Sequence, residues 1–111
     1  MRFTVDDNKI TRYLLNSSGP PEARGKAAFF QALGFSVADP EGLRRALIAH
    51  TVSASRLADE IDRHGYGRKI IFECALPQTP KGGAYCVRTV WIEADGGFRF
   101  VTAYPRERPM L

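Results

Sequence analysis

The sequence is poor in the residues that build metal centres and disulfide frameworks. Its 111 residues include two histidines and two cysteines, and none of the four shares a spacing typical of metal ligands. We therefore expect no metal site and no cofactor. Cys74 and Cys86 fall in neighbouring predicted strands without a Cys-x-x-Cys spacing, which favours small core residues over a disulfide framework.

Long apolar runs are also lacking. No stretch approaches the ~20 residues that a helix needs to span a bilayer, so we expect no membrane partner. The N-terminus turns acidic at Asp6 and Asp7, too early for a signal peptide. These features predict a cytoplasmic protein, or one delivered by another route into the cytoplasm of a target cell. Repeats and low-complexity segments are not found, and the length predicts a single domain over residues 1–111.

The composition is that of an ordinary globular protein with a basic balance. Hydrophobic residues make up 44% and charged residues 25% of the chain, and the net charge is +4. A sequence pI of about 9.4 weakly favours a polyanionic partner such as RNA. Most of these charges can equally be explained as a solvated surface.

Three helices are predicted in the first half of the chain. The first begins after Asp6 or Asp7 and carries Tyr13 on its apolar face. The second covers about residues 22–33 and is followed by Gly34. The third opens at Asp39 with a proline in its first turn. The segment 53–64 can be either a further helix or an irregular loop.

After Gly67 the period of the pattern changes to that of strands. Strands are predicted over about residues 68–76, 85–93 and 98–104, with a possible short edge strand at residues 1–5. Helices followed by consecutive strands with short connections indicate an α+β fold, with N-terminal helices packed on a C-terminal antiparallel β-meander.

The last two strands flank Asp95-Gly96-Gly97, a strong hairpin signal. A two-residue turn would place Thr89 opposite Thr102. A three-residue turn with a bulge at Gly97 would place Arg88 opposite Tyr104 and on the same face as Thr102. We prefer the three-residue turn, because it gathers Val90, Ile92, Phe98 and Phe100 on one side and the polar residues at one end.

Several blocks along residues 8–105 resemble one family. They are Tyr13-Leu14-Leu15-Asn16, Gly25-Lys26-Ala27-Ala28-Phe29-Phe30 with Gly34-Phe35, His50, Val87-Arg88-Thr89-Val90-Trp91 and Val101-Thr102-Ala103-Tyr104-Pro105. The family consists of short bacterial domains of unknown function, found alone or at the C-termini of polymorphic toxins. The last block more distantly resembles toxin ribonucleases of the barnase–EndoU–colicin–RelE group. The resemblance implies, by analogy, a toxin that cleaves RNA without a metal.

Such cleavage requires a base for the 2′-hydroxyl, a cation for the developing phosphorane charge and an acid for the leaving 5′-oxygen. Several residues have side chains that can supply these groups: His50, His64, Lys26, Lys69, Arg88, Glu73, Thr102 and Tyr104. We predict His50, Arg88, Thr102 and Tyr104 as the catalytic group. Lys26, Arg68 and Lys69 are predicted to bind the substrate.

Each candidate has a structural alternative. His50 ends an apolar helical face and can be a buried, hydrogen-bonded histidine. Arg88 can form a salt bridge to Glu73 or Glu93 instead of meeting an anion. Thr102 and Tyr104 can be ordinary strand residues, and Lys26 a solvated charge. Trp91 is expected in the core.

Two other classes of function remain open. One is a non-catalytic binding module, such as an immunity protein or antitoxin, although such proteins are more often acidic. The other is a transferase-type toxin that modifies RNA or protein. For the ribonuclease, the expected partners are RNA and a small acidic antitoxin or immunity protein.

Overall fold

The computed structural model describes residues 2–18, 21–61, 67–82 and 85–106. The described part contains short helical segments at the N-terminus, two longer helices and five strands. In chain order the elements are β1 (Phe3–Thr4), α1 (Asp7–Lys9), the π-helix η1 (Ile10–Leu14), α2 (Pro21–Ala32), α3 (Pro40–Ser53), β2 (Ser55–Ile61), β3 (Arg68–Ala75), β4 (Cys86–Ala94) and β5 (Gly97–Pro105). This order confirms the predicted α+β class.

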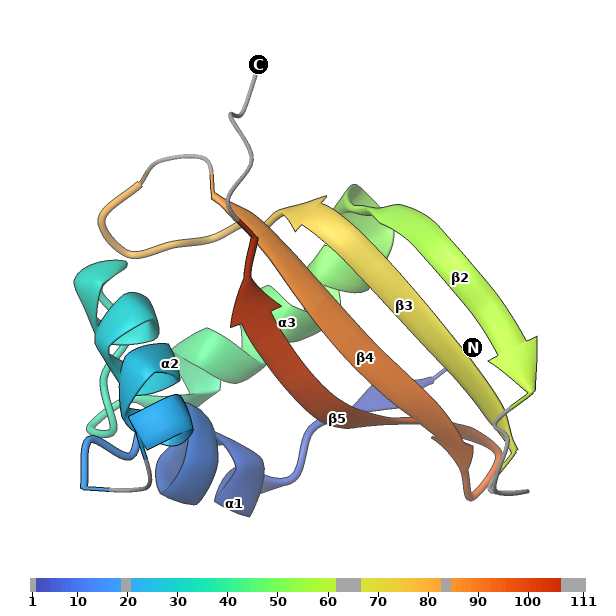
Figure 1. Ribbon diagram of the computed structural model, residues 1–111, viewed down its shortest axis with the longest axis horizontal. Helices are drawn as coiled ribbons and strands as arrows, with labels where there is room; N and C mark the ends of the chain where they lie inside the picture. Colours follow the sequence, from blue (N-terminus) through green and yellow to red (C-terminus); the bar gives the residue numbers. More distant parts are fainter. Residues whose placement is uncertain (1, 19–20, 62–66, 83–84, 107–111) are drawn as a thin grey trace.

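The strands form one five-stranded sheet in the order β1-β5-β4-β3-β2. The pairs β2–β3, β3–β4 and β4–β5 are antiparallel and form a meander. The short β1 pairs parallel to β5, so the sheet is mixed, and the edge strand expected near the N-terminus is present. Figure 1 shows the meander as a twisted sheet, with α3 behind it and α1 and α2 to one side.

Neither alternative for residues 53–64 was right, because residues 55–61 form β2. The helix formers Ala58 and Glu60 favour a helix locally. Their backbone groups instead pair with Ile71 and Lys69 of β3, and this tertiary pairing overrides the local propensity. Residues 62–66, His64 among them, lie outside the described residues.

The helices cover one face of the sheet, here called the inner face. The buried side chains of α3, Leu43, Ala46 and Leu47, belong to the same hydrophobic core as Trp91 and Phe100 of the sheet. Trp91 is thus in the core, as expected. The other side, called the open face, carries the partly exposed Ile71, Val90 and Ile92. The predicted grouping of Val90 and Ile92 with Phe98 and Phe100 is therefore wrong.

The β4–β5 hairpin reaches the predicted pairing by an unexpected route. Ala94 pairs with Gly97 across a two-residue turn, in which Asp95 and Gly96 both have positive φ, 50° and 80°, as a type I′ turn requires. The preferred three-residue turn is therefore wrong. The register shifts between Val90 and Trp91, and this bulge leaves Val101 unpaired and moves every later residue of β5 by one position. Arg88 consequently lies opposite Tyr104, and Val90 opposite Thr102.

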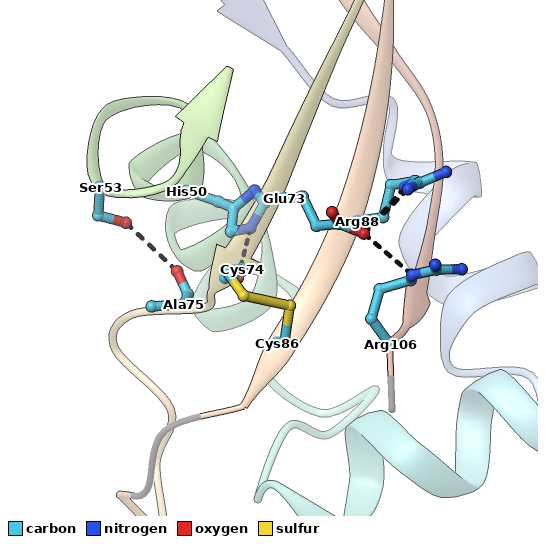
Figure 2. Close-up of a disulfide and its surroundings, with 8 residues drawn as sticks. All are labelled: His50, Ser53, Glu73, Cys74, Ala75, Cys86, Arg88 and Arg106. Carbon is cyan, nitrogen blue, oxygen red and sulfur yellow. Dashed lines mark hydrogen bonds and ion pairs between the residues drawn. A yellow bond between two sulfur atoms is a disulfide. The ribbon is translucent and has the colours of Figure 1, made fainter. Parts of the chain in front are cut away.

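Cys74 and Cys86 form a disulfide, which corrects the prediction of two unlinked core cysteines (Figure 2). In the ladder Cys74 pairs with Val87, whereas Cys86 pairs with Ala75, so a regular pleat would point the two side chains to opposite faces. Cys74 has a φ of 104°, a backbone conformation that departs from the pleat and redirects its side chain towards Cys86. Spacing along the sequence could not reveal this local irregularity.

Candidate functional site

Seven polar side chains gather at one end of the open face, where β3, β4 and β5 lie beside η1 and α2. We call them the open-face cluster: Tyr13, Lys26, Glu73, Arg88, Thr102, Tyr104 and Arg106. Alternation along the strands explains three of them, because Glu73, Arg88 and Tyr104 occupy directly paired positions on adjacent strands. The cluster holds more cations than carboxylates, so it favours an anionic ligand.

Arg88 is fixed by partners on both sides. Its Nε and Nη2 donate to Glu73 Oε1 at 3.2 and 3.0 Å. Its guanidinium carbon lies 5.9 Å from the centre of the Tyr104 ring. A hydrogen bond with Tyr104, followed by the interaction with Glu73, raises the pKa of Arg88 above its usual value. Arg88 is thus a permanent cation held in a set direction, with 22% of its side chain exposed.

Arg106 approaches the same carboxylate from the end of β5. Its Nε lies 2.9 Å from Glu73 Oε1, so two guanidinium groups face one oxygen of a side chain that is only 4% exposed (Figure 2). Among the described residues, Nε of Arg106 makes no contact with hydrogen-bond geometry. The structure therefore shows the structural alternative considered for Arg88, an ion pair with Glu73 rather than Glu93, and it adds a second arginine that the sequence did not single out.

Lys26 and Tyr13 meet Thr102 on the other side of the cluster. Lys26 Nζ donates to Thr102 Oγ1 at 3.0 Å and also to the Tyr13 hydroxyl. The Tyr13 hydroxyl lies 2.9 Å from Thr102 Oγ1. Lys26 Nζ is also 5.7 Å from the centre of the Tyr104 ring. This triangle joins η1, α2 and β5 and ties the helices to the strand that carries Tyr104.

Tyr13 is a site residue that the sequence did not indicate. Burial alone would raise the pKa of its hydroxyl, but hydrogen bonds from Lys26 and Thr102 and the charges of Lys26 and Lys9 lower it below the ordinary value. A tyrosine beside two lysines can reach the phenolate state more readily than a free tyrosine. Its helical position made Tyr13 look like one more apolar-face residue, and no pattern in the sequence brings it next to Thr102.

His50 does not belong to the cluster, so the structure does not bring it together with Arg88, Thr102 and Tyr104 as predicted. It is fully buried and projects from α3 onto the inner face. Nε2 lies 2.9 Å from the carbonyl oxygen of Cys74, and Nδ1 lies 2.9 Å from Thr89 Oγ1. Trp91 Nε1 also donates to Thr89 Oγ1. Burial lowers the pKa of His50 despite hydrogen bonds with the backbone, so His50 is uncharged at neutral pH.

The two cations predicted with Lys26 to bind the substrate lie outside the cluster. Arg68 is bound by both oxygens of Asp59 on β2, and it stacks over Phe98 on the opposite side of the sheet. Lys69 follows the alternation of Glu73 and lies on the open face opposite Ile92. Lys69 precedes Glu73 by four positions, which corresponds to about 13 Å along β3. Of the seven predicted residues, the structure gathers Lys26, Arg88, Thr102 and Tyr104.

Within the described residues, no group of three or more His, Cys, Asp or Glu side chains could hold a metal ion. Over the same residues, no helix is long and apolar enough to cross a membrane. The functional groups of the open-face cluster are cations, hydroxyls and one buried carboxylate.

Comparison with known proteins gives one family and one fold. The family model described as a domain of unknown function, DUF6883, matches residues 1–107. No curated protein sequence matches the chain. A chain of a contact-dependent growth inhibition toxin–immunity protein complex from Klebsiella pneumoniae 342 has a similar structure, with a TM-score of 0.71 and 21% identity. The similarity covers 93% of this chain and 99% of that chain, and at this identity it shows a shared fold.

Proposed function

For this chain, which belongs to the DUF6883 family, we propose the function of a toxin of the toxin–immunity kind that cleaves RNA at the open-face cluster. The observation that carries the proposal is the convergence of Lys26, Arg88 and Arg106 with the hydroxyls of Tyr13 and Tyr104 on one uncovered sheet face. This set combines a site for an anion with groups that transfer protons. The shared fold with a component of a toxin–immunity complex supports the toxin-related part.

The proposed reaction is a transesterification within the RNA. The ribose 2′-oxygen bonds to phosphorus while the bond from phosphorus to the 5′-oxygen breaks. The 2′-hydroxyl proton passes to a base, and a proton from an acid goes to the leaving 5′-oxygen. The products are a 2′,3′-cyclic phosphate and a 5′-hydroxyl, and the atoms balance without water.

Tyr13 is the proposed base. Its hydroxyl has the lowered pKa that proton uptake by a phenolate requires, and Lys26 holds it in place. Tyr104 is the proposed acid, because its ring lies between the cations Lys26 and Arg88. Arg88 is proposed to stabilise the charge that develops on the phosphorane oxygens, because its planar guanidinium group can donate two parallel hydrogen bonds to them.

Glu73 acts in this scheme as a positioning residue. Its oxygen holds two of the nitrogens of Arg88 and leaves the remainder of the guanidinium to meet a phosphate. Arg106, which faces the same oxygen, can turn to a phosphate without leaving the Glu73 charge unpaired, because Arg88 still binds Glu73. The cluster thus contains one fixed and one adjustable arginine.

The proposed protein partner is a small acidic immunity protein or antitoxin. The chain carries a net charge of +4, and an acidic surface placed over the open-face cluster would both pair with its cations and exclude RNA. The proposed place of action is the cytoplasm of the cell in which RNA is cut.

The test is RNA cleavage by the purified chain in the presence of EDTA. The wild type is expected to cut RNA to products with 2′,3′-cyclic phosphate ends. Arg88→Ala should lower the rate by roughly 10²–10³, the usual effect of removing one transition-state donor. Arg45→Ala, which removes an exposed arginine of α3, is the matched control and should leave the rate unchanged.

Tyr13→Phe separates proton transfer from folding. It should lower the rate by roughly 10²-fold, and the rise of the wild-type rate with pH should flatten. Tyr85→Phe, at an exposed tyrosine, should change neither. A folded wild type that leaves RNA intact would refute the ribonuclease proposal.

A second candidate is a non-catalytic module that binds a toxin. The similar structure is a complex of a toxin with an immunity protein, so the shared fold alone supports either role. Expression in cells separates the two. Growth arrest that Arg88→Ala relieves is expected for the toxin, whereas protection of cells against another toxin would favour the binding module.

A further inference from the structure

A hollow lies on the open face next to the cluster. It has a volume of about 280 Å³ and is lined by Asp6, Lys9, Ile92, Arg99, Phe100 and Val101. This volume is close to the lower end of pockets that hold small organic ligands, about 300 Å³. The hollow forms where the bulge at Val101 interrupts the pairing of β4 with β5.

The lining divides into an apolar floor and a charged rim. The partly exposed Ile92 and Val101 supply the apolar floor, on which a flat ligand can pack, whereas the Phe100 side chain is buried in the core. Lys9 and Arg99 supply two cations on the rim. Asp6 is the one rim carboxylate, and its Oδ1 accepts a hydrogen bond from the backbone N–H of Asn8 at 2.9 Å, which fixes it at the start of α1.

Two residues that line the hollow, Val101 and Lys9, lie next to members of the open-face cluster. Val101 of the floor directly precedes Thr102 of the cluster. On the rim, Lys9 Nζ lies 5.5 Å from the centre of the Tyr13 ring, and Lys26 Nζ lies 4.7 Å from the same centre. One tyrosine ring therefore separates a cation of the hollow from a cation of the cluster.

We propose that the hollow binds a nucleotide of the RNA just beyond the two nucleosides that the cut phosphodiester joins. The base packs on Ile92 and Val101, the phosphate lies between Lys9 and Arg99, and Asp6 accepts a hydrogen bond from a ribose hydroxyl or a base amino group. A ligand that joins an anion to a flat ring matches this lining better than inorganic phosphate alone. The inference rests on the proposed function, because it assigns the substrate unit next to the same cluster.

Arg99 is the residue that distinguishes this subsite from the cluster. It is exposed, and it lies opposite Ile92 in the ladder. It takes no part in the contacts of Arg88, Lys26 or Tyr13 described above. Its removal should therefore affect substrates that reach the hollow and leave the chemistry at the cluster intact.

The test compares a dinucleoside monophosphate with an RNA hexamer as substrates of the full chain. For the wild type, kcat/KM should be at least tenfold higher for the hexamer. Arg99→Gln should remove most of this advantage, about tenfold or 1.4 kcal/mol, while cleavage of the dinucleoside monophosphate stays the same. Arg45→Gln carries the same charge change on α3 and should keep the full advantage.

A binding measurement makes the subsite testable without catalysis. Adenosine monophosphate, titrated into the folded chain, should shift the backbone amide signals of Ile92 and Val101 in NMR spectra, and Arg99→Gln should abolish the shifts. If the wild type binds adenosine monophosphate there but cuts no RNA, the proposed function fails and the subsite stands. If RNA is cut but Arg99→Gln slows both substrates equally or neither, the subsite is refuted and the function stands.

Discussion

Replacing Thr89 by valine should destabilise the protein strongly although it changes almost no volume. Nε2 of His50 must carry a proton, because the carbonyl oxygen of Cys74, its partner, can only accept a hydrogen bond. Nδ1 is then an acceptor, and the Thr89 hydroxyl donates a hydrogen bond to it. The same hydroxyl oxygen accepts from Trp91 Nε1. Donors and acceptors thus alternate through a fully satisfied chain.

The magnitude follows from what Thr89→Val leaves behind. Nε1 of Trp91 and Nδ1 of His50 both lose a partner in a region where all three side chains are fully buried. Each unsatisfied buried group costs about 1–3 kcal/mol, so the loss of two partners should lower the free energy of unfolding by about 2–6 kcal/mol. Thr89→Ser keeps the hydroxyl and loses one methyl group, at about 1 kcal/mol.

Urea unfolding, followed by the fluorescence of Trp91, measures this difference. The three proteins should show similar m values, with the midpoint falling from wild type to Thr89→Ser to Thr89→Val. A Thr89→Val protein as stable as Thr89→Ser would refute the hydrogen-bond chain. If Thr89→Val unfolds in the absence of urea, the loss exceeds that of Thr89→Ser and the reasoning holds.

Further expectations concern pH, redox state and one close backbone approach. Because burial lowers the pKa of His50 from 6.5, its contribution to stability should be complete above pH 6.5 and fall as the pH drops below it, by at most about 1.4 kcal/mol per pH unit. His50→Gln should flatten that slope in urea titrations at several pH values. Reduction of the disulfide between Cys74 and Cys86 should lower the free energy of unfolding by about 3 kcal/mol, which a double serine variant should reproduce. Gly97→Ala should lower the melting temperature, because its Cβ would lie 2.5 Å from the backbone oxygen of Arg2, whereas Gly25→Ala has open space and should not.

The helices and the main strands could be predicted because their signals are local. Asp6 caps the first helical segment through a bond to Asn8, and Asp39 followed by Pro40 opens α3. The Asp95-Gly96 pair supplies the two positive φ angles of the hairpin turn. Each of these residues determines the backbone conformation within a few positions of itself, so its effect can be recognised directly in the sequence.

The site could be predicted in part, for the same reason. Arg88 and Tyr104 were expected on one face from the pairing of two neighbouring strands, and they are paired. The bulge at Val101 that produces this pairing has no signal of its own in the sequence. Tyr13 and Arg106 were missed, because their approach to the cluster depends on how η1 and the end of β5 pack against distant residues.

The two faces of β4 suggest a last test, because a histidine outside the cluster should still affect the proposed ribonuclease activity. Arg88 and Thr89 are neighbours in the chain, so the residue that faces the open-face cluster and the residue that anchors His50 share one strand segment. Loss of the buried hydrogen bonds loosens the register of this segment and with it the position of Arg88. A fall in activity on replacing His50 is therefore expected from stability alone. Only a fall that persists after correction for the folded fraction would return His50 to the chemistry, whereas Arg88→Ala should show such a fall.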